Sequence, residues 1–205
     1  MRLDEILNKI GSTKLIAVSK NVTENEVLEL YSQGQMDFGE NRVQELKRKK
    51  DVLHNLNLNW HFIGRLQANK INHLLALHPI LWQSCESFSM ALAVDKRLDY
   101  TLDCLLQINS AHEESKQGVD PNVAIDEFLR IKQSCKNLNL VGVMSIGAHS
   151  DDIKEIQKSF ESTYKIYENL QKYGAKICSM GMSSDYELAI KCGSNMIRLG
   201  TILYK

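Results

Sequence analysis

The sequence alternates short apolar runs with longer stretches in which apolar residues recur every three or four positions. The short runs, such as 15–18, are aliphatic and carry no charge, which is typical of buried parallel strands. The longer stretches, such as 153–170, place their apolar residues on one face of a helix. The predicted strands are 13–20, 36–40, 59–63, 80–84, 101–108, 140–146, 177–180 and 196–199.

Helices are expected between these strands, and several have recognisable ends. Gly11 follows a first amphipathic helix over 3–10, and Thr23 and Glu26 form a capping box ahead of a helix that stops at Gly34. The remaining helices are predicted at about 42–53, 69–77, 87–98, 123–135, 153–170 and 185–192.

Eight strand–helix units predict an α/β fold, a (β/α)₈ TIM barrel, as a single domain over residues 1–205 with an extra N-terminal helix. The alternative is an open doubly wound sheet. That fold would want a Gly-rich turn after the first strand, and the sequence has none there.

Composition and charge argue against several classes of partner. With 25 basic and 25 acidic residues, the chain has no electrostatic footprint for nucleic acid or an anionic membrane. The sequence shows neither a signal peptide nor an apolar run of about 20 residues, so we expect a cytoplasmic protein. Its five cysteines are scattered and are expected to be reduced and mostly buried.

A lysine stands at the end of the first predicted strand. Alternation along the strand puts Ile16, Val18 and Lys20 on one face. Lys20 has two interpretations: a side chain that reaches solvent from a strand end, or a nucleophile whose amine is freed by partial burial and forms a Schiff base.

Other chemistry-bearing residues are predicted at the same rim, because the C-terminal ends of barrel strands converge. The turn 180–185 carries Gly181 and two hydroxyls just before a helix, and 198–201 closes the last strand. Loops after strands seven and eight commonly bind phosphate in this fold, although a helix cap and an ordinary turn would look similar. The residues predicted at or just beyond strand ends are Lys20, Asn41, Gly64, His149, Ser183 and Gly200.

The combination matters more than any single residue. An amine nucleophile, a phosphate cradle and Arg198 beside it match what pyridoxal 5′-phosphate (PLP) requires of a protein. Because an arginine does not give up its proton, a ring nitrogen facing Arg198 would stay unprotonated and the ring would be a weaker electron sink.

The sequence resembles the pyridoxal-phosphate homeostasis proteins, single-domain barrels related to the N-terminal domain of alanine racemase. The resemblance covers nearly the whole chain and rests on five motifs. It implies that Lys20 carries PLP as an imine, that Ser183, Gly200 and Thr201 hold the phosphate, that Arg198 faces the ring nitrogen and that Asn41 lies near the cofactor. The motifs are A-V-S-K (17–20), F-G-E-N-x-V-Q-E (38–45), W-H-F-I-G-x-L-Q-x-N-K (60–70), S-M-G-M-S-x-D (179–185) and R-x-G-T (198–201).

The chain also departs from the family pattern. Relatives usually follow the lysine with a second lysine and a proline, where residues 21–23 here read N-V-T. The loop 110–120 keeps an E-x-S-K-x-G pattern at 114–118. His149 stands near the end of strand six, where relatives tend to have a proline, and is expected to be solvated.

The remaining polar motifs are expected to be structural. The basic run 47–50 is interpreted as a solvated helix face because no aromatic residues interleave it. His61 is expected to sit with its hydrogen bonds satisfied inside the barrel. His73 and His78 are five apart, and no Cys/His cluster suggests a metal.

We therefore expect a monomeric PLP-binding protein that takes part in intracellular PLP homeostasis without substantial catalysis and without catalytic residues. PLP-dependent enzymes are candidate recipients of the cofactor. The rival hypotheses are a PLP-dependent amino-acid racemase, a Schiff-base aldolase, and an interaction module that uses the barrel as a scaffold. Racemisation is not expected, because the chain stops at Lys205 and the tyrosine base of alanine racemase comes from a second, C-terminal domain.

Overall fold

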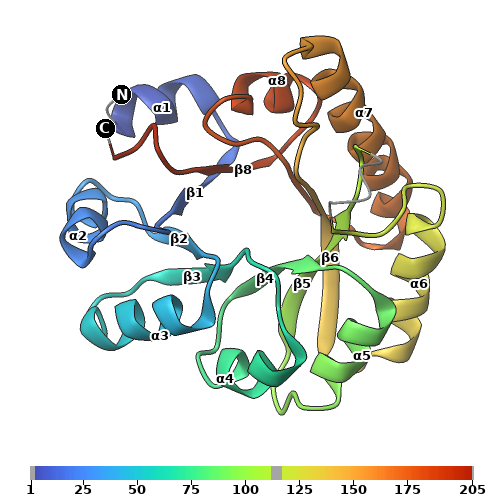
Figure 1. The fold of residues 1–205 in the computed structure, drawn as a ribbon, viewed down its shortest axis with the longest axis horizontal. Helices are drawn as coiled ribbons and strands as arrows, with labels where there is room; N and C mark the ends of the chain where they lie inside the picture. Colours follow the sequence, from blue (N-terminus) through green and yellow to red (C-terminus); the bar gives the residue numbers. More distant parts are fainter. Residues whose placement is uncertain (1–2, 112–116, 205) are drawn as a thin grey trace.

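The computed structural model describes residues 3–111 and 117–204, and within them eight parallel strands form a closed barrel. Figure 1 looks along the barrel, with the strands in the middle and the helices outside. The strands are β1 (Lys14–Val18), β2 (Asp37–Glu40), β3 (Asn59–Phe62), β4 (Leu81–Cys85), β5 (Leu102–Ile108), β6 (Leu138–Ser145), β7 (Ile177–Ser179) and β8 (Met196–Leu199).

The barrel closes because the last strand pairs with the first. Each strand pairs in parallel with the next along the chain, and β8 pairs with β1, where Ala17 faces Leu199 and Ile16 faces Arg198. The predicted barrel is thus confirmed, and the open-sheet alternative is wrong.

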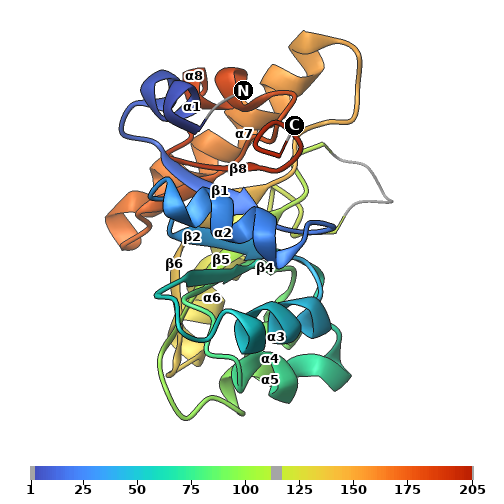
Figure 2. The ribbon, with the colours of Figure 1, turned by 90° about the vertical axis from the view of Figure 1, so that its left-hand side faces the viewer.

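Helices cover the outside of this barrel, as the side view in Figure 2 also shows. The extra helix α1 precedes β1 as predicted, and it lies beside α8, where Lys9 pairs with Glu187 at 3.5 Å. The helices are α1 (Leu3–Ile10), α2 (Glu24–Ser32), α3 (Val43–Val52), α4 (Ile71–Leu75), α5 (Phe88–Asp95), α6 (Ala124–Ser134), α7 (Ile153–Leu170) and α8 (Tyr186–Lys191), with 3₁₀ turns at Ala68–Lys70 and Gln171–Tyr173.

Side chains cap the first turns of α2, α5 and α7. The capping box before α2 is present: Thr23 accepts from the Glu26 amide, and Glu26 accepts from the Thr23 amide at 2.7 Å. The prediction of one helix over 69–77 is only partly right, because this segment begins as a 3₁₀ turn and α4 has only five residues.

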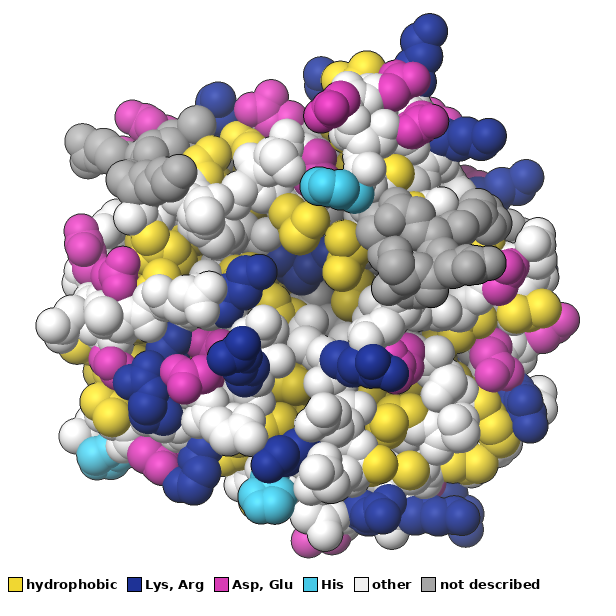
Figure 3. Space-filling view, in the orientation of Figure 1, with side chains coloured by type: hydrophobic (Ala, Val, Ile, Leu, Met, Phe, Trp, Pro, Cys, Tyr) yellow, Lys and Arg dark blue, Asp and Glu magenta, His cyan; other side chains and the backbone are white. Residues whose placement is uncertain are grey.

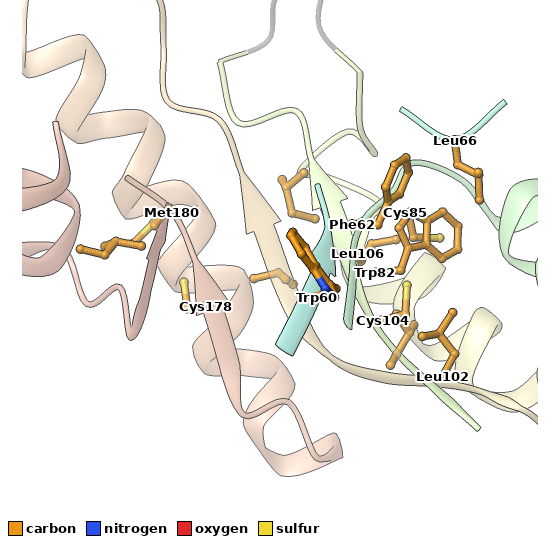
Figure 4. Packing of buried hydrophobic residues seen from close by; sticks show 14 of the residues in the cluster. Trp60, Phe62, Leu66, Trp82, Cys85, Leu102, Cys104, Leu106, Cys178 and Met180 are labelled. Carbon is orange, nitrogen blue, oxygen red and sulfur yellow. The ribbon is translucent and has the colours of Figure 1, made fainter. Parts of the chain in front are cut away.

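The apolar residues form two layers. The larger lies between the outer faces of the strands and the helices; Figure 4 shows Phe62, Trp82, Cys85 and Leu106 gathered there. The smaller fills the interior of the barrel with Ile16, Leu81, Leu105, Met144 and Met196.

The five cysteines are free thiols, three of them buried, as expected from their scattered positions. Burial raises the pKa of the Cys178 thiol to about 12, so it is protonated at neutral pH. In the described part of the chain, no helix has the length and apolar character needed to cross a membrane.

Candidate functional site

A cavity of about 310 Å³ opens at the C-terminal rim of the barrel. This volume is at the lower end of the roughly 300–1,000 Å³ typical of small-molecule sites. The space-filling view, which looks onto this rim, shows a central hollow bordered by hydrophobic and basic side chains (Figure 3). The lining residues come from the ends of β1, β3 and β8 and from the turn after β7: Val18, Lys20, Ile63, Met182, Ser183, Ser184, Arg198, Gly200 and Thr201.

Five of the six predicted site residues therefore line one cavity. Lys20, Ser183, Arg198, Gly200 and Thr201 are brought together from positions up to 181 residues apart. A larger groove of about 560 Å³ lies beyond Ser183 and Ser184, between α7 and α8, but neither Lys20 nor Arg198 lines it.

Lys20 stands two residues beyond the end of β1. Ile16 belongs to the inner apolar layer, and Val18 and Lys20 line the cavity above it, so the predicted shared face is confirmed. The Lys20 side chain is exposed rather than partly buried, so its amine is accessible from the solvent side of the cavity.

A buried ion pair holds the backbone next to Lys20. Lys49 and Glu40 are 1% and 0% exposed, and their charged groups lie 2.5 Å apart. Lys49 also donates to the carbonyl oxygen of Ser19, and the Ser19 hydroxyl donates to Glu40 at 2.8 Å. The cluster thus ties the residue before Lys20 to β2 and α3.

This cluster is not predicted from the sequence, because the basic run 47–50 has the charge pattern of a solvated helix face. Lys47 and Arg48 are exposed as expected, but Lys49 is not. A signal was present: Val43, Leu46 and Lys49 recur every three residues and share the inward face of α3. The interpretation of 47–50 as a solvated face is wrong for Lys49.

The turn after β7 and the end of β8 are joined by a hydrogen bond. The Gly200 amide donates to the Ser183 hydroxyl at 3.2 Å. Asp185, not a serine, stands at the N-cap of α8 and accepts from the Met182 amide at 2.6 Å. The alternative in which Ser183 or Ser184 caps the helix is therefore wrong.

This turn leaves hydrogen-bond donors at the cavity. Among the described residues, the backbone amides of Ser184 and Thr201 have no protein acceptor. Gly181 permits the turn because its φ is +98° and a Cβ there would lie 2.6 Å from that of Ala189. Unused amides beside a hydroxyl suit an anionic group such as a phosphate.

Arg198 supplies a buried positive charge on the inner side of the cavity. It is 5% exposed, and it donates to the Ser179 hydroxyl at 2.6 Å and to the Ser145 carbonyl at 2.8 Å. Burial lowers the pKa of Arg198 to about 10, opposed by the attraction of Asp185, so the guanidinium stays charged at neutral pH. Met196 and Arg198 lie on the inward face of β8, and Gly200, just beyond its end, continues that face into the cavity.

Asn41 follows β2 at the same rim but is not among the cavity-lining residues. Its amide donates to Glu40 at 3.3 Å, and its carbonyl oxygen packs so closely on Gly64 that a Cβ there would overlap it. Gly64 is thus needed for this close approach, and the role of Asn41 stays a prediction.

The other motifs have simpler places. His61 is 1% exposed, with partners on both ring nitrogens, as expected. His149 is exposed. Residues 114–116 of the predicted 114–118 pattern lie outside the described residues, and within the described ones no group of three His, Cys, Asp or Glu residues could hold a metal.

Comparison with known proteins shows the family to which the chain belongs. Residues 2–205 match the family model described as alanine racemase, N-terminal domain. The pyridoxal phosphate homeostasis protein of Helicobacter pylori (strain ATCC 700392 / 26695) is 49% identical over 94% of this chain and 87% of the relative. The chain belongs to the pyridoxal phosphate homeostasis protein family.

Solved structures similar to this chain have the same fold. PipY of Synechococcus elongatus PCC7942 without PLP has a TM-score of 0.93 at 33% identity, covering 100% of this chain and 98% of PipY. PipY with PLP bound has a TM-score of 0.89 at 32% identity, over the same shares of the two chains. The family resemblance inferred from the five sequence motifs is thereby confirmed.

Proposed function

We propose that this chain binds PLP in the rim cavity and takes part in PLP homeostasis. The observation that carries the proposal is the convergence of Lys20, Arg198 and the Ser183–Gly200 pair on one cavity. The names of the relatives and the PLP-bound structure of PipY support it. When bound, PLP supplies an aldehyde that reacts with amines and a ring that can withdraw electrons from the bound group.

Lys20 forms the covalent imine in this proposal. Its amine is exposed and lines the cavity, so an incoming aldehyde can reach it. The buried Lys49–Glu40 pair forms hydrogen bonds with Ser19, and these bonds limit the positions that the Lys20 backbone can take. This restraint keeps the Lys20 backbone in one position while its side-chain amine reaches the cavity.

The phosphate lies against Ser183, Gly200 and Thr201. The support is the Ser183 hydroxyl together with the unused amides of Ser184 and Thr201, because a phosphate oxygen prefers several N–H and O–H donors. The Gly200 amide donates to the Ser183 hydroxyl and so holds it beside these amides.

Arg198 faces the ring nitrogen and donates a hydrogen bond to it. A guanidinium that stays charged cannot pass a proton to the nitrogen, so the ring withdraws electrons only weakly. Weak electron withdrawal suits a protein that stores or transfers the cofactor without substantial catalysis of its own. Asn41 lies near the cofactor in this proposal, but it packs on Gly64 at the rim and does not line the cavity.

Borohydride reduction tests the covalent assignment. The protein is loaded with PLP, reduced, digested and mapped by mass spectrometry, with an unreduced sample as control. We expect one modified peptide carrying Lys20 and a visible absorbance that disappears on reduction. Modification of another lysine would contradict the role of Lys20, and a protein that never takes up PLP would contradict the function itself.

A further inference from the structure

A continuous chain of hydrogen bonds leads from Arg198 down into the barrel. Arg198 Nη1 lies 2.6 Å from Ser179 Oγ, which lies 2.8 Å from Gln83 Oε1. Gln83 Nε2 lies 3.2 Å from His61 Nδ1, and His61 Nε2 lies 3.0 Å from Asp37 Oδ1. Branched aliphatic residues usually fill such a barrel, so a polar series at this depth calls for a reason.

The far end of this series of hydrogen bonds is an ion pair at the opposite mouth of the barrel. Lys14, the first residue of β1, lies 2.8 Å from Asp37, the first residue of β2. Burial acts to raise the pKa of Asp37, but the bonds from His61 and Lys14 outweigh it and lower that pKa. Asp37 therefore carries a negative charge at neutral pH.

Every donor in the chain points away from the cavity. The guanidinium group of Arg198 contains only donors, so it donates to the Ser179 hydroxyl. That hydroxyl donates in turn to Gln83 Oε1. The ionised Asp37 carboxylate can only accept, so neutral His61 donates to it from Nε2, and the lone pair left on His61 Nδ1 accepts from the Gln83 amide. The dipoles are aligned and turn their negative ends toward Arg198.

This alignment compensates a buried charge. Among the described residues, no carboxylate lies within ion-pair distance of Arg198: Asp185 attracts it from farther away, and its hydrogen bonds go to the neutral oxygens of Ser179 and Ser145. Aligned hydrogen bonds strengthen one another in a medium of low dielectric constant. The chain thus supplies part of the stabilisation that a paired carboxylate would otherwise give.

Gln83 sets the direction of the whole series. It is fully buried on β4 and does not line the cavity. Its NH₂ group must face the His61 lone pair, and its amide oxygen then faces the Ser179 hydroxyl; turned the other way, the amide oxygen would oppose that lone pair. Its Nε2 also lies 3.5 Å from the sulfur of Met196, which holds the amide in place from below.

We propose that Gln83, acting through Ser179, is a positioning residue that orients Arg198 toward the nitrogen of a bound heteroaromatic ring. The inference rests on the proposed function, because the ring in question is that of PLP. Two of the five guanidinium N–H groups are held by Ser179 and Ser145. The orientation they impose decides which remaining N–H groups face the cavity.

The test compares PLP with 1-deaza-PLP, in which a C–H group replaces the ring nitrogen. Dissociation constants for both are measured by absorbance titration on the full chain and on Gln83→Met, which conserves volume but removes both hydrogen bonds. Ser179→Ala breaks the same chain one link closer to Arg198. Leu105→Met, also inside the barrel, controls for repacking.

We expect the wild-type chain to prefer PLP over the deaza analogue, and Gln83→Met to weaken PLP binding about three- to tenfold with deaza-PLP affinity unchanged. Ser179→Ala should have the same effect, and the double variant should lose little more, because both act through one link. Equal losses for both ligands, no loss for PLP, or no wild-type preference would overturn the inference while leaving PLP binding intact. A wild-type chain that binds neither ligand would instead overturn the proposed function.

Discussion

The ammonium of Lys49 lies 2.5 Å from the carboxylate of Glu40, and protein encloses both groups almost completely. The pair sits under the turn that carries Lys20, because Lys49 also donates to the Ser19 carbonyl. Buried ion pairs often add little net stability, but removing one partner leaves an uncompensated charge. Their effect is therefore clearest when only one partner is changed.

We predict that Lys49→Met lowers the free energy of unfolding by about 3–5 kcal/mol, measured by urea denaturation. Replacing both partners, with Glu40→Leu added, should recover part of that loss because no lone buried charge remains. Lys47→Met is the control, since Lys47 pairs with Asp51 on the exposed face of the same helix. Similar stabilities for the Lys47 and Lys49 variants would contradict the buried pair.

Lys20→Ala should abolish the visible absorbance of the PLP-loaded protein while leaving it folded. Lys20 is exposed, so its removal should change the free energy of unfolding by no more than about 0.5 kcal/mol. Absorbance and urea titration measure the two effects separately. A variant that keeps its colour would show that another amine carries the cofactor.

Ser183→Ala should weaken PLP binding by roughly ten- to a hundredfold, because a hydrogen bond to a charged group contributes about 1.5–3 kcal/mol. The variant also releases the Gly200 amide, which donates to Ser183 at 3.2 Å. Pyridoxal without its phosphate should bind poorly to the wild type and be insensitive to the substitution. The matched control is Ser89→Ala on the exposed surface of α5, and unchanged affinity at Ser183 would move the phosphate elsewhere.

Stability should fall as the pH drops from about 7 toward 5, partly because of His61. Burial lowers its pKa below the ordinary value of 6.5, although Asp37 opposes this. The unfolded chain therefore binds the proton first, and stability present above pH 6.5 is lost as the pH falls toward the lowered native pKa. His61→Gln should flatten this slope by up to about 1.4 kcal/mol per pH unit, and exposed His54→Gln should not.

The sequence predicted what depends on local periodicity. The apolar runs of the strands and the amphipathic pattern of the helices predicted the barrel. The positions of the strand ends predicted Lys20, Ser183 and Gly200 as site residues, because parallel strands bring their C-terminal ends to one rim. The burial of Lys49 could have been read from its spacing with Val43 and Leu46. The basic run 47–50, with no aromatic residues among its charges, instead favours a solvated face.

The interior hydrogen-bond chain had no comparable signal. His61, Gln83 and Ser179 come from three strands and meet only when the register of the closed barrel is known. Gln83 and Ser84 follow three apolar residues, and a polar residue in such a short run indicates neither its partner nor its orientation. Such contacts depend on long-range packing, which periodicity does not encode.

Alanine racemisation at a useful rate is not expected. Racemisation needs a proton-transfer group on each face of the substrate, and Lys20 can serve only one. Tyr204 is a poor candidate for the other face: it is not among the cavity-lining residues, and burial, with added repulsion from Glu26 and Glu40, raises the pKa of its hydroxyl.

A ring nitrogen facing Arg198 would also stabilise negative charge at Cα only weakly, which increases the demand on the second base. PLP-loaded protein incubated with L-alanine in deuterated water should show slow Cα exchange without inversion, followed by NMR and chiral chromatography. Lys20→Ala, the matched control, should lose the exchange because it removes the one positioned amine. Steady formation of D-alanine that disappears in Lys20→Ala would contradict this prediction and favour a racemase.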